Sequence, residues 1–376
     1  MASSTGVDSA TTRPLFAFAT GGEGSGDEER LRCLLEPRQF ELLPFQRGAK
    51  RAMFLAIVRA ARSRRYPLLV MEGTGLAGGL ALIWAHLRYK TRYVVSSGDA
   101  VAPFLTARRP LGRLLFALYE RRLCAGAAGF IGWTPYLAGR ALTLGAPRAM
   151  TAAGWAPFPP APPEAGERLR RELRIPSEAL VFGIAGSLAW SARQRYCYGM
   201  ELVQALCRGP ASAPVHVLIV GEGEGRAHLE RAAGAELGRR VHLVGAVPRA
   251  QVPQYLAAMD VGSLPQSVDG VGSFRYSTKL SEYLAAQLPY CTTRIPAAYD
   301  LDSGGLWRLP GTSPWDPVFV AALAGLMASL RPAEVAAKRR RLPSAAEPFD
   351  RERQTARVQA FLAELLPEAK APESEE

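Results

Sequence analysis

The chain alternates short, unbroken apolar runs with helix-length segments, and this rhythm constrains its fold more than any other feature. Continuously apolar runs are typical of parallel strands that helices cover on both faces. The pattern predicts an α/β protein with two doubly wound parallel sheets, one in each of two domains of similar size. The runs occupy residues 15–20, 40–45, 67–73, 92–99, 128–133 and 149–155, and then 181–186, 215–223, 241–247, 260–266 and 288–293.

The boundary between the two series is the segment from Trp155 to Glu164, which holds five prolines. Proline lacks a backbone N–H and fixes φ, so this segment excludes both a helix interior and a central strand. We predict an N-terminal domain over 1–155, a linker over 156–165 and a C-terminal domain over 166–345, with helices at 317–330 and about 350–366. Residues 346–376 should form a C-terminal helix and an acidic tail.

The 376 residues are long enough for two domains that each bury a core, and they include no apolar run of ~18 residues that could span a membrane. The first residues, MASSTGVDSATTRP, lack the basic start and apolar core of a secretory signal. Five scattered cysteines without a C-x-x-C pair argue against a disulfide framework and a zinc site. We therefore expect a cytoplasmic globular protein.

The positive charge is concentrated in the N-terminal half. Residues 1–157 hold 21 Lys and Arg against 10 Asp and Glu, an excess of 11, whereas residues 158–376 hold 25 against 24, an excess of 1. Such a surface can face anionic lipid or a phosphorylated substrate, or it can simply keep the protein soluble. No nucleic-acid-binding motif accompanies the charge, so we expect no nucleic-acid partner. Peripheral contact with the inner face of a membrane is a further hypothesis.

Three loops after N-terminal strands carry glycine or acidic residues. Gly22, Glu23 and Gly24 follow the first run, Glu72 ends the third, and Asp99 follows the fourth. Glycine lets a ligand approach the backbone closely, and ligands of open parallel sheets bind beyond the carboxyl ends of the strands. The spacing matches neither a Rossmann fingerprint nor a P-loop. Ordinary turns and helix caps use the same residue types, so both interpretations stay open.

The first strand of the C-terminal domain is followed by Gly186 and Ser187, with Arg193 and Arg195 close behind. Backbone N–H groups and arginine side chains suit a diphosphate. Either arginine can instead be an exposed residue at the start of a helix.

The most specific stretch runs from Asp269 to Pro289. A glycine-bearing loop leads to Ser277 or Thr278 as the predicted N-cap, so the free N–H groups of the first helical turn can hold phosphate, with Lys279 adding a positive charge. Glu282 lies one turn further, where its carboxylate could accept two hydrogen bonds from a ribose diol. The alternative is a solvated Lys279–Glu282 pair, which would contribute only ~0.2–0.5 kcal/mol.

Several of these segments resemble GT-B glycosyltransferases of family 4 (glycosyltransferase group 1). They are GIAGSL, VHLVGAV, the helix ending at residues 257–260, and TKLSEYLAAQLPY, all within about residues 180–300. The resemblance implies two Rossmann-like domains that face an interdomain cleft. It implies an enzyme of the polysaccharide-biosynthesis kind that moves a sugar from a UDP- or GDP-sugar to a hydroxyl of a glycan or lipid-linked acceptor, usually with retention. No metal and no other cofactor are expected.

The resemblance also implies donor-site roles. Glu282 would bind the nucleotide ribose, Arg193 or Arg195 would bind the diphosphate, and backbone near Gly245 would meet the base. The first turn from Ser277 would complete the donor site.

On the acceptor side we place the loop residues Gly22, Glu23 and Gly24 together with Glu72. Asp99 is the candidate catalytic group that contacts the acceptor hydroxyl. An ordinary carboxylate is a weak base at neutral pH unless it is desolvated.

The sequence departs from the family pattern at three places. Phe274 occupies the position of a second glutamate that contacts the donor sugar, and Asp269 is the candidate catalytic carboxylate that could replace it. Gln287 stands where glycine is usual, and residues 97–99 stand where a histidine is common. Two alternatives therefore stay open: a catalytically silent protein that binds sugar nucleotides or glycans, and a sugar-nucleotide epimerase.

Overall fold

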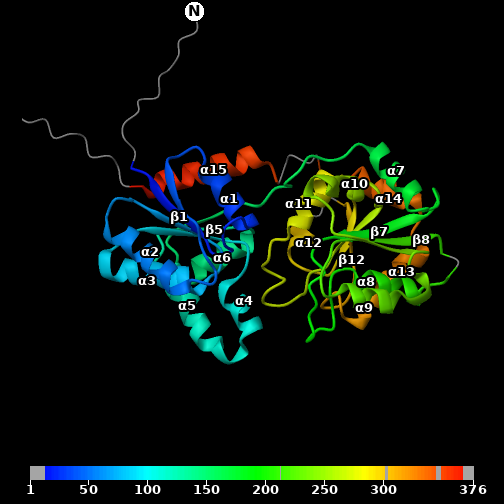
Figure 1. Cartoon of the computed structure of the whole chain (residues 1–376), viewed down its shortest axis with the longest axis horizontal. Coiled ribbons are helices and arrows are strands. Elements are labelled where there is room, and N and C mark those ends of the chain that lie inside the picture. The colour runs from blue at the N-terminus through cyan, green and yellow to red at the C-terminus, as the bar shows by residue number, and fades with distance from the viewer. Residues whose placement is uncertain (1–12, 212, 301–303, 344–348, 367–376) are drawn as a thin grey trace, which may run out of the picture. The chain divides into compact units, whose positions relative to one another are not determined.

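The computed structural model describes residues 13–211, 213–300, 304–343 and 349–366, which form two compact units (Figure 1). The N-terminal unit comprises Met1–Gly154, Phe274–Tyr276 and Arg351–Glu376, and the C-terminal unit comprises Trp155–Ser273 and Ser277–Asp350. The predicted acidic tail and the predicted boundary at residues 345 and 346 lie outside the described residues.

The N-terminal unit has a six-stranded sheet in which every pairing is parallel, as the apolar runs predict. The strand order β2-β1-β3-β4-β5-β6 reverses direction between β1 and β3. In sheets of this kind, ligands bind at the carboxyl ends of the strands that flank such a reversal. The strands are β1 Leu15–Ala19, β2 Phe40–Leu43, β3 Leu69–Glu72, β4 Tyr93–Ser97, β5 Gly129–Gly132 and β6 Ala149–Thr151.

Helices cover this sheet and enclose an apolar core in which Phe18, Ile57 and Val95 are fully buried. Phe45 stacks on Phe18 with ring centroids 5.9 Å apart. The helices are α1 Gly26–Leu35, α2 Lys50–Arg62, α3 Leu76–Tyr89, α4 Val101–Arg108, α5 Arg113–Ala125 and α6 Pro135–Thr143, with a 3-10 turn η1 at Pro110–Gly112.

The C-terminal helix, α15 (Arg351–Leu365), belongs to the N-terminal unit. It lies beside α1 (Figure 1), where the side-chain amide of Gln359 donates to the carbonyl of Leu34 at 2.5 Å. It also packs closely on β5: a Cβ at Gly129 would come within 2.7 Å of the side chains of Leu365 and Phe361. The sequence predicted this helix but not the unit that it completes.

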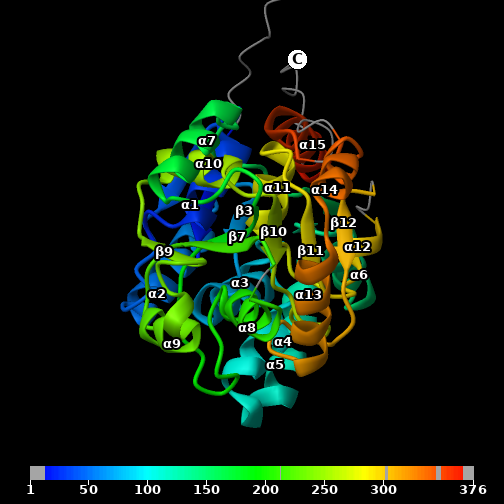
Figure 2. The ribbon, with the colours of Figure 1, turned by 90° about the vertical axis from the view of Figure 1, so that its right-hand side faces the viewer.

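The C-terminal unit has a second all-parallel sheet, with the order β12-β11-β10-β7-β8-β9. The strand order, not the strand direction, reverses between β7 and β10. In Figures 1 and 2, α8, α9 and α13 cover one face, whereas α7, α10, α11 and α14 lie on the other. The strands are β7 Leu180–Ala185, β8 Val215–Val220, β9 Val241–Gly245, β10 Val261–Leu264, β11 Tyr290–Thr292 and β12 Leu306–Arg308.

At the end of the predicted linker, proline begins a helix instead of preventing one. Residues 156–162 have no helix or strand, but α7 begins at Pro163, inside the range 156–165 predicted as linker. This end of the prediction was wrong because proline is well suited to the first turn of a helix, where its missing N–H is not needed. The helices are α7 Pro163–Glu172, α8 Met200–Arg208, α9 Arg226–Ala233, α10 Val252–Ala257, α11 Thr278–Ala285, α12 Ala297–Asp300, α13 Pro317–Ser329 and α14 Pro332–Arg339, with 3-10 turns η2 at Gly234–Glu236 and η3 at Arg249–Gln251.

All five cysteines are free, as expected. Among the described residues, no single helix has the length and apolar character needed to cross a membrane. One helix pair, Pro317–Ser329 with Pro332–Arg339, meets these criteria only when both helices are taken together, and it is bent by 107°.

The packing of α15 gives a stability prediction. Leu362 is fully buried, whereas Arg357 on the same helix is exposed. Leu362→Ala should lower the free energy of unfolding of the N-terminal unit by about 2–5 kcal/mol, because it removes buried methyl groups and leaves a cavity. Denaturant unfolding measures this, with Arg357→Ala as the matched control. Equal effects of the two substitutions would show that α15 is not part of the N-terminal core.

Candidate active site

In the C-terminal unit, three neighbouring strands each end in a glycine with positive φ. These are Gly186 after β7 (157°), Gly221 after β8 (146°) and Gly245 at the end of β9 (91°). Their loops bond backbone to backbone: Gly186 N donates to Val220 O at 2.9 Å, and Gly221 N donates to Gly245 O at 2.8 Å. A Cβ at Gly221 would collide with the carbonyl oxygen of Gly186. Glycine is therefore required where these loops pack together.

The structure brings Lys279 against Gly186 at the point where strand order reverses. Ser277 is the N-cap of α11 and Thr278 its first residue, as predicted, and the Ser277 side chain makes no capping hydrogen bond. Lys279 is only 7% exposed, and its Nζ lies 4.4 Å from the ring centroid of Tyr198. A Cβ built on Gly186 would lie 2.8 Å from this Nζ. A fixed positive charge thus lies directly beside backbone that has no side chain.

Glu282 is half-buried one turn into α11. Burial raises the pKa of its carboxyl group, and the charge of Lys279 and the hydroxyl of Thr278 oppose this shift. The alternative of a solvated Lys279–Glu282 pair is wrong, because Lys279 is buried. Glu282 is therefore a partly desolvated carboxylate near a buried cation, and its role in binding ribose stays a prediction.

The other predicted donor residues lie on the loop between β7 and α8. Ser187, Arg193 and Arg195 are all exposed there. The arginines are not at a helix start, since α8 begins at Met200. Their contact with a diphosphate stays a prediction.

Two side-chain arrangements near this loop were not predicted. Trp190 stacks on His228 of α9, with ring centroids 3.5 Å apart and planes 4° apart. Glu201, which is 1% exposed, accepts hydrogen bonds from Tyr196 Oη at 2.8 Å and Ser263 Oγ at 2.7 Å. Burial raises the pKa of Glu201. The only sequence signal for this network is a carboxylate at the start of an otherwise apolar helix.

In the N-terminal unit, a cavity of about 600 Å³ lies at the carboxyl ends of β1, β3 and β4. It therefore lies at the reversal of strand order, where the fold predicts a ligand site. It is lined by Thr20, Gly21, Asp27, Phe45, Arg47, Lys50, Glu72, Gly73, Thr74, Gly75, Leu76, Ala77, Ser97, Gly98, Asp99, Phe104, Leu105, Arg109, Phe116, Trp133 and Tyr276.

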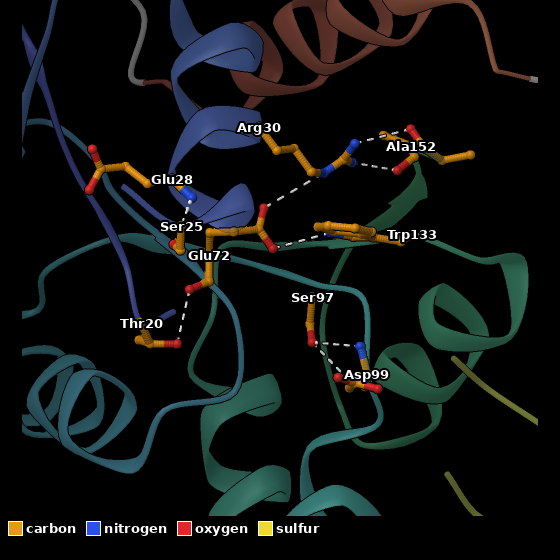
Figure 3. A network of polar contacts seen from close by, with 10 residues as sticks. Thr20, Ser25, Glu28, Arg30, Glu72, Ser97, Asp99, Trp133 and Ala152 are labelled. Atoms are coloured by element: carbon orange, nitrogen blue, oxygen red, sulfur yellow. Dashed lines mark hydrogen bonds and ion pairs between the residues drawn. The ribbon is translucent and has the colours of Figure 1, made fainter. Parts of the chain in front are cut away.

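Glu72 is at the centre of a buried polar network beside this cavity (Figure 3). Trp133 Nε1 donates to its Oε1 at 3.1 Å, and Arg30 Nε lies 3.8 Å from its Oε2. The Arg30 guanidinium lies 4.2 Å from the Trp133 ring centroid and donates to the carbonyls of Ala152 and Ala153 at 2.6 and 3.1 Å. Within the described residues, Glu72 Oε2 receives no hydrogen bond.

This environment changes the acidity of two carboxyl groups. Burial raises the pKa of Glu72 to about 7, with Arg30 opposing the shift and Asp27 adding to it. The pKa of Asp27 is also raised, by burial and by the nearby charge of Asp99, again opposed by Arg30. Glu72 therefore titrates near neutral pH, where an ordinary glutamate is almost fully ionised.

Asp99, the candidate catalytic residue, lines the same cavity and is held by Arg275, whose Nε donates to its Oδ1 at 2.5 Å. Ser97 Oγ accepts from Asp99 N at 3.2 Å and donates to Asp99 O at 2.7 Å. The carboxylate is thus oriented within the cavity wall by a salt bridge and a short turn.

Residues 274–276 were predicted in the C-terminal domain, but they pack within the N-terminal unit. The carbonyl of Phe274 accepts from Thr134 Oγ1 at 2.9 Å, and Tyr276 packs edge-on against Trp133 with centroids 5.6 Å apart. The boundary 166–345 was wrong here because these contacts depend on tertiary packing. Phe274 is an apolar contact in this unit.

Asp269, the other candidate catalytic residue, lies in an exposed loop of the C-terminal unit. Its Oδ1 accepts the backbone N–H groups of Val271 and Gly272, both at 2.8 Å. Asp is the favoured residue for such a turn, so its presence has a structural reason.

The predicted acceptor-side loop meets the cavity one residue earlier than expected. Gly21 and Asp27 line the cavity, whereas Gly22, Glu23 and Gly24 are not among its lining residues. A Cβ at Gly22 would lie 3.2 Å from the side chain of Arg47. Their place in acceptor binding stays a prediction, whereas Glu72 does line the cavity.

Across the described parts of the chain, no group of three or more His, Cys, Asp or Glu side chains is placed to hold a metal ion. His216 and His242 lie within β8 and β9 rather than on loops, with their ring nitrogens 3.0 Å apart.

Comparisons with known proteins agree with this architecture. Residues 179–314 match the family described as Glycosyl transferases group 1. None of the curated proteins compared with the chain matches its sequence. Among solved structures, Anabaena Alr3699/HepE in complex with UDP and glucose is 16% identical with a TM-score of 0.68, covering 93% of this chain and 100% of that one. Sucrose-phosphate synthase (tll1590) from Thermosynechococcus elongatus is 15% identical with a TM-score of 0.66, covering 94% and 99%.

The two parallel-sheet units therefore have the GT-B fold, and the predicted fold class is confirmed. The match at residues 179–314 confirms the resemblance of this segment to glycosyltransferase group 1.

The raised pKa of Glu72 gives a prediction for stability. Between its ordinary value of 4.5 and about 7, the folded protein keeps a proton that the unfolded chain has lost. Stability from this group therefore falls as pH rises through that window, by up to about 3 kcal/mol. Glu72→Gln keeps an oxygen for Trp133 but cannot ionise, so it should remove this part of the pH dependence.

Urea unfolding of both proteins at about pH 5 and pH 8 measures the difference. Glu224→Gln, at an exposed glutamate, is the control. Parallel pH profiles for the wild type and Glu72→Gln would contradict the assignment.

Proposed function

We propose that the chain is a glycosyltransferase that moves a sugar from a UDP- or GDP-sugar to a hydroxyl of a glycan or lipid-linked acceptor. The C-terminal unit holds the donor and the N-terminal unit holds the acceptor. The observation that carries the proposal is the buried Lys279 beside Gly186, because it combines a fixed cation with backbone that a diphosphate can approach.

Donor binding follows from this arrangement. The diphosphate accepts hydrogen bonds from the first turn of α11 and from the loop at Gly186, and Lys279 balances its charge. Glu282 accepts hydrogen bonds from the ribose hydroxyls, and Gly245 lies where the base would meet backbone. HepE, which shares this fold, is described in complex with UDP and with UDP-glucose, which supports a nucleotide-sugar donor.

Departure of the diphosphate builds negative charge at its outer phosphate. Lys279, the free N–H groups of α11 and one of Arg193 and Arg195 stabilise that charge as fixed partners. We propose that these groups suffice without a metal ion and that the transfer retains anomeric configuration.

Acceptor binding uses the cavity of the N-terminal unit. The carboxylates of Asp27, Glu72 and Asp99 accept hydrogen bonds from sugar hydroxyls, and the ring of Trp133 adds an apolar surface beside them. Asp99, oriented by Arg275, contacts the reacting hydroxyl.

A catalytically silent protein that binds sugar nucleotides is the second candidate. It is favoured by Phe274, which packs in the N-terminal unit and supplies no carboxylate for a donor sugar. Full donor affinity with no turnover on any acceptor would support it, whereas an isomerised donor in the product mixture would indicate an epimerase.

Calorimetric titration of UDP, GDP and ADP tests the donor site. One nucleotide should bind best, and Glu282→Ala should weaken it by roughly ten- to hundredfold, because losing hydrogen bonds to ribose costs ~1–3 kcal/mol. Glu224→Ala should leave affinity unchanged, because Glu224 is exposed on the turn after β8. If none of the three nucleotides binds, the proposed donor site is wrong.

Asp99→Asn tests the acceptor side. The substitution keeps the shape of the side chain but removes its charge, so kcat should fall by about hundredfold or more while UDP affinity stays the same. Release of the nucleotide diphosphate from a donor sugar measures the rate. An unchanged kcat would exclude Asp99 from the reaction.

A further inference from the structure

The exposed apolar side chains of the described residues are concentrated in one part of the N-terminal unit. Eight large ones lie between residues 55 and 118, on α2, α3, η1 and α5. α3 packs against both α2 and α5, so these elements are neighbours. The exposed side chains are Leu55 (50%), Leu80 (48%), Trp84 (41%), Leu87 (63%), Leu111 (105%), Leu114 (84%), Leu115 (72%) and Leu118 (53%).

Four of them lie close together in the sequence on η1 and α5, and we call them the leucine stripe: Leu111, Leu114, Leu115 and Leu118. The last three recur on one face of α5, whereas Tyr119 and Leu123 on its other face are buried in the core. A single exposed leucine needs no explanation, but a contiguous exposed apolar surface marks an interaction site.

The segment that carries these leucines is strongly basic. From Arg47 to Arg122 the sequence has 15 Lys and Arg but only three acidic residues. Glu72 and Glu120 are buried, at 0% and 2% exposure, and Glu120 is bonded to Arg140 at 2.6 Å, while Asp99 is paired with Arg275. The acidic side chains of this segment are therefore buried or paired.

Arginines directly adjoin the leucine stripe on α5. Arg113, Arg121 and Arg122 are exposed on this helix. The helix therefore presents apolar side chains and flexible cations together, with no exposed carboxylate between them.

We propose that the leucine stripe and its arginines are a membrane-docking surface for an anionic lipid bilayer. Leucine side chains enter the boundary between headgroups and acyl chains, as on an interfacial amphipathic helix, and the arginines extend to lipid phosphates. Charge complementarity selects this occupant. A second copy of the chain would bring two basic surfaces together, because a twofold interface uses the same patch on both subunits.

The docking surface and the cavity share one structural segment (Figure 1, α4 and α5 in cyan). Phe104, Leu105, Arg109 and Phe116 of this segment line the cavity. The same segment therefore contributes to the cavity wall and carries the leucine stripe.

The cavity lining has two chemical parts. Glu72 is fully buried, whereas the cations Arg47, Lys50 and Arg109 are exposed. A sugar linked through phosphate to a lipid matches this arrangement. Its hydroxyls would lie at the buried carboxylates, its phosphate at the exposed cations, and its lipid in the bilayer. This assignment of the acceptor class rests on the proposed function, whereas the docking surface does not.

Flotation of the full chain with lipid vesicles tests the docking surface without donor or acceptor. The protein should float with vesicles of phosphatidylcholine plus phosphatidylglycerol and remain behind with phosphatidylcholine alone. The triple variant Leu114→Gln, Leu115→Gln, Leu118→Gln should have an affinity for anionic vesicles that is lower by at least about tenfold. The control variant Leu142→Gln, Leu237→Gln changes leucines that are exposed elsewhere (49% and 42%) and should bind like the wild type.

A second pair of variants tests the charges. Arg113→Glu, Arg121→Glu, Arg122→Glu should bind anionic vesicles at least about tenfold more weakly, because these side chains face lipid phosphate. Arg168→Glu, Arg171→Glu on the exposed face of α7 should leave binding unchanged. Circular dichroism and UDP titration show whether each variant is folded.

Three results would overturn the proposal: equal binding to neutral and anionic vesicles, undiminished binding by the folded leucine variant, or no vesicle binding by the wild type. Sedimentation that shows a dimer dissolved by the leucine substitutions would instead assign the stripe to self-association. Vesicle binding needs no substrate, so it tests the docking surface even if the chain transfers no sugar. The donor titration likewise tests the proposed function even if the chain binds no vesicles.

Discussion

The ion pair between Arg30 and Glu72 is the interaction on which the N-terminal site depends. Both side chains are buried, so neither charge could remain there without a partner. Arg30 comes from α1 and Glu72 from the end of β3, and Arg30 also bonds to the carbonyl groups that follow β6. Removing one partner of such a pair typically costs about 3–5 kcal/mol, because the other charge stays buried. The pair thus fixes the cavity wall, while burial of Glu72 raises its pKa to about 7 against the opposing charge of Arg30.

Most of the fold could be predicted from the sequence because its strands are continuously apolar. Each of the eleven apolar runs corresponds to a strand from β1 to β11. β12 was not predicted: it has three residues, Leu306–Arg308, and ends in an exposed arginine at the sheet edge. The unit to which α15 belongs could not be predicted either, because it depends on close packing against Gly129, which is more than 200 residues away in the sequence.

The candidate site could be predicted only where local rules suffice. Strand-end glycines and a helix N-cap are local signals, and they led to Gly186, Ser277 and Lys279. The contact of Arg30 with Glu72 and Trp133 depends on three segments far apart in the sequence. Its only local signal is an arginine beside Leu31 on the buried face of α1. Likewise, Phe274 was considered as a lost donor contact, whereas its neighbours in space are Arg140 and Thr134.

The distribution of charge separates two roles of the N-terminal unit. If its basic residues served only to attract an anionic substrate, they would converge on the cavity, since a site concentrates charge where its ligand binds. Arg47, Lys50 and Arg109 do line the cavity, but its most deeply buried ionisable group is a carboxyl, Glu72. Other arginines lie on α5, whose exposed side chains include Leu114, Leu115 and Leu118. Leucine contributes nothing to the attraction of a small anion in water, but it adds affinity for a lipid surface. The combination of exposed leucine with exposed basic charge is therefore what the proposed membrane-docking surface requires.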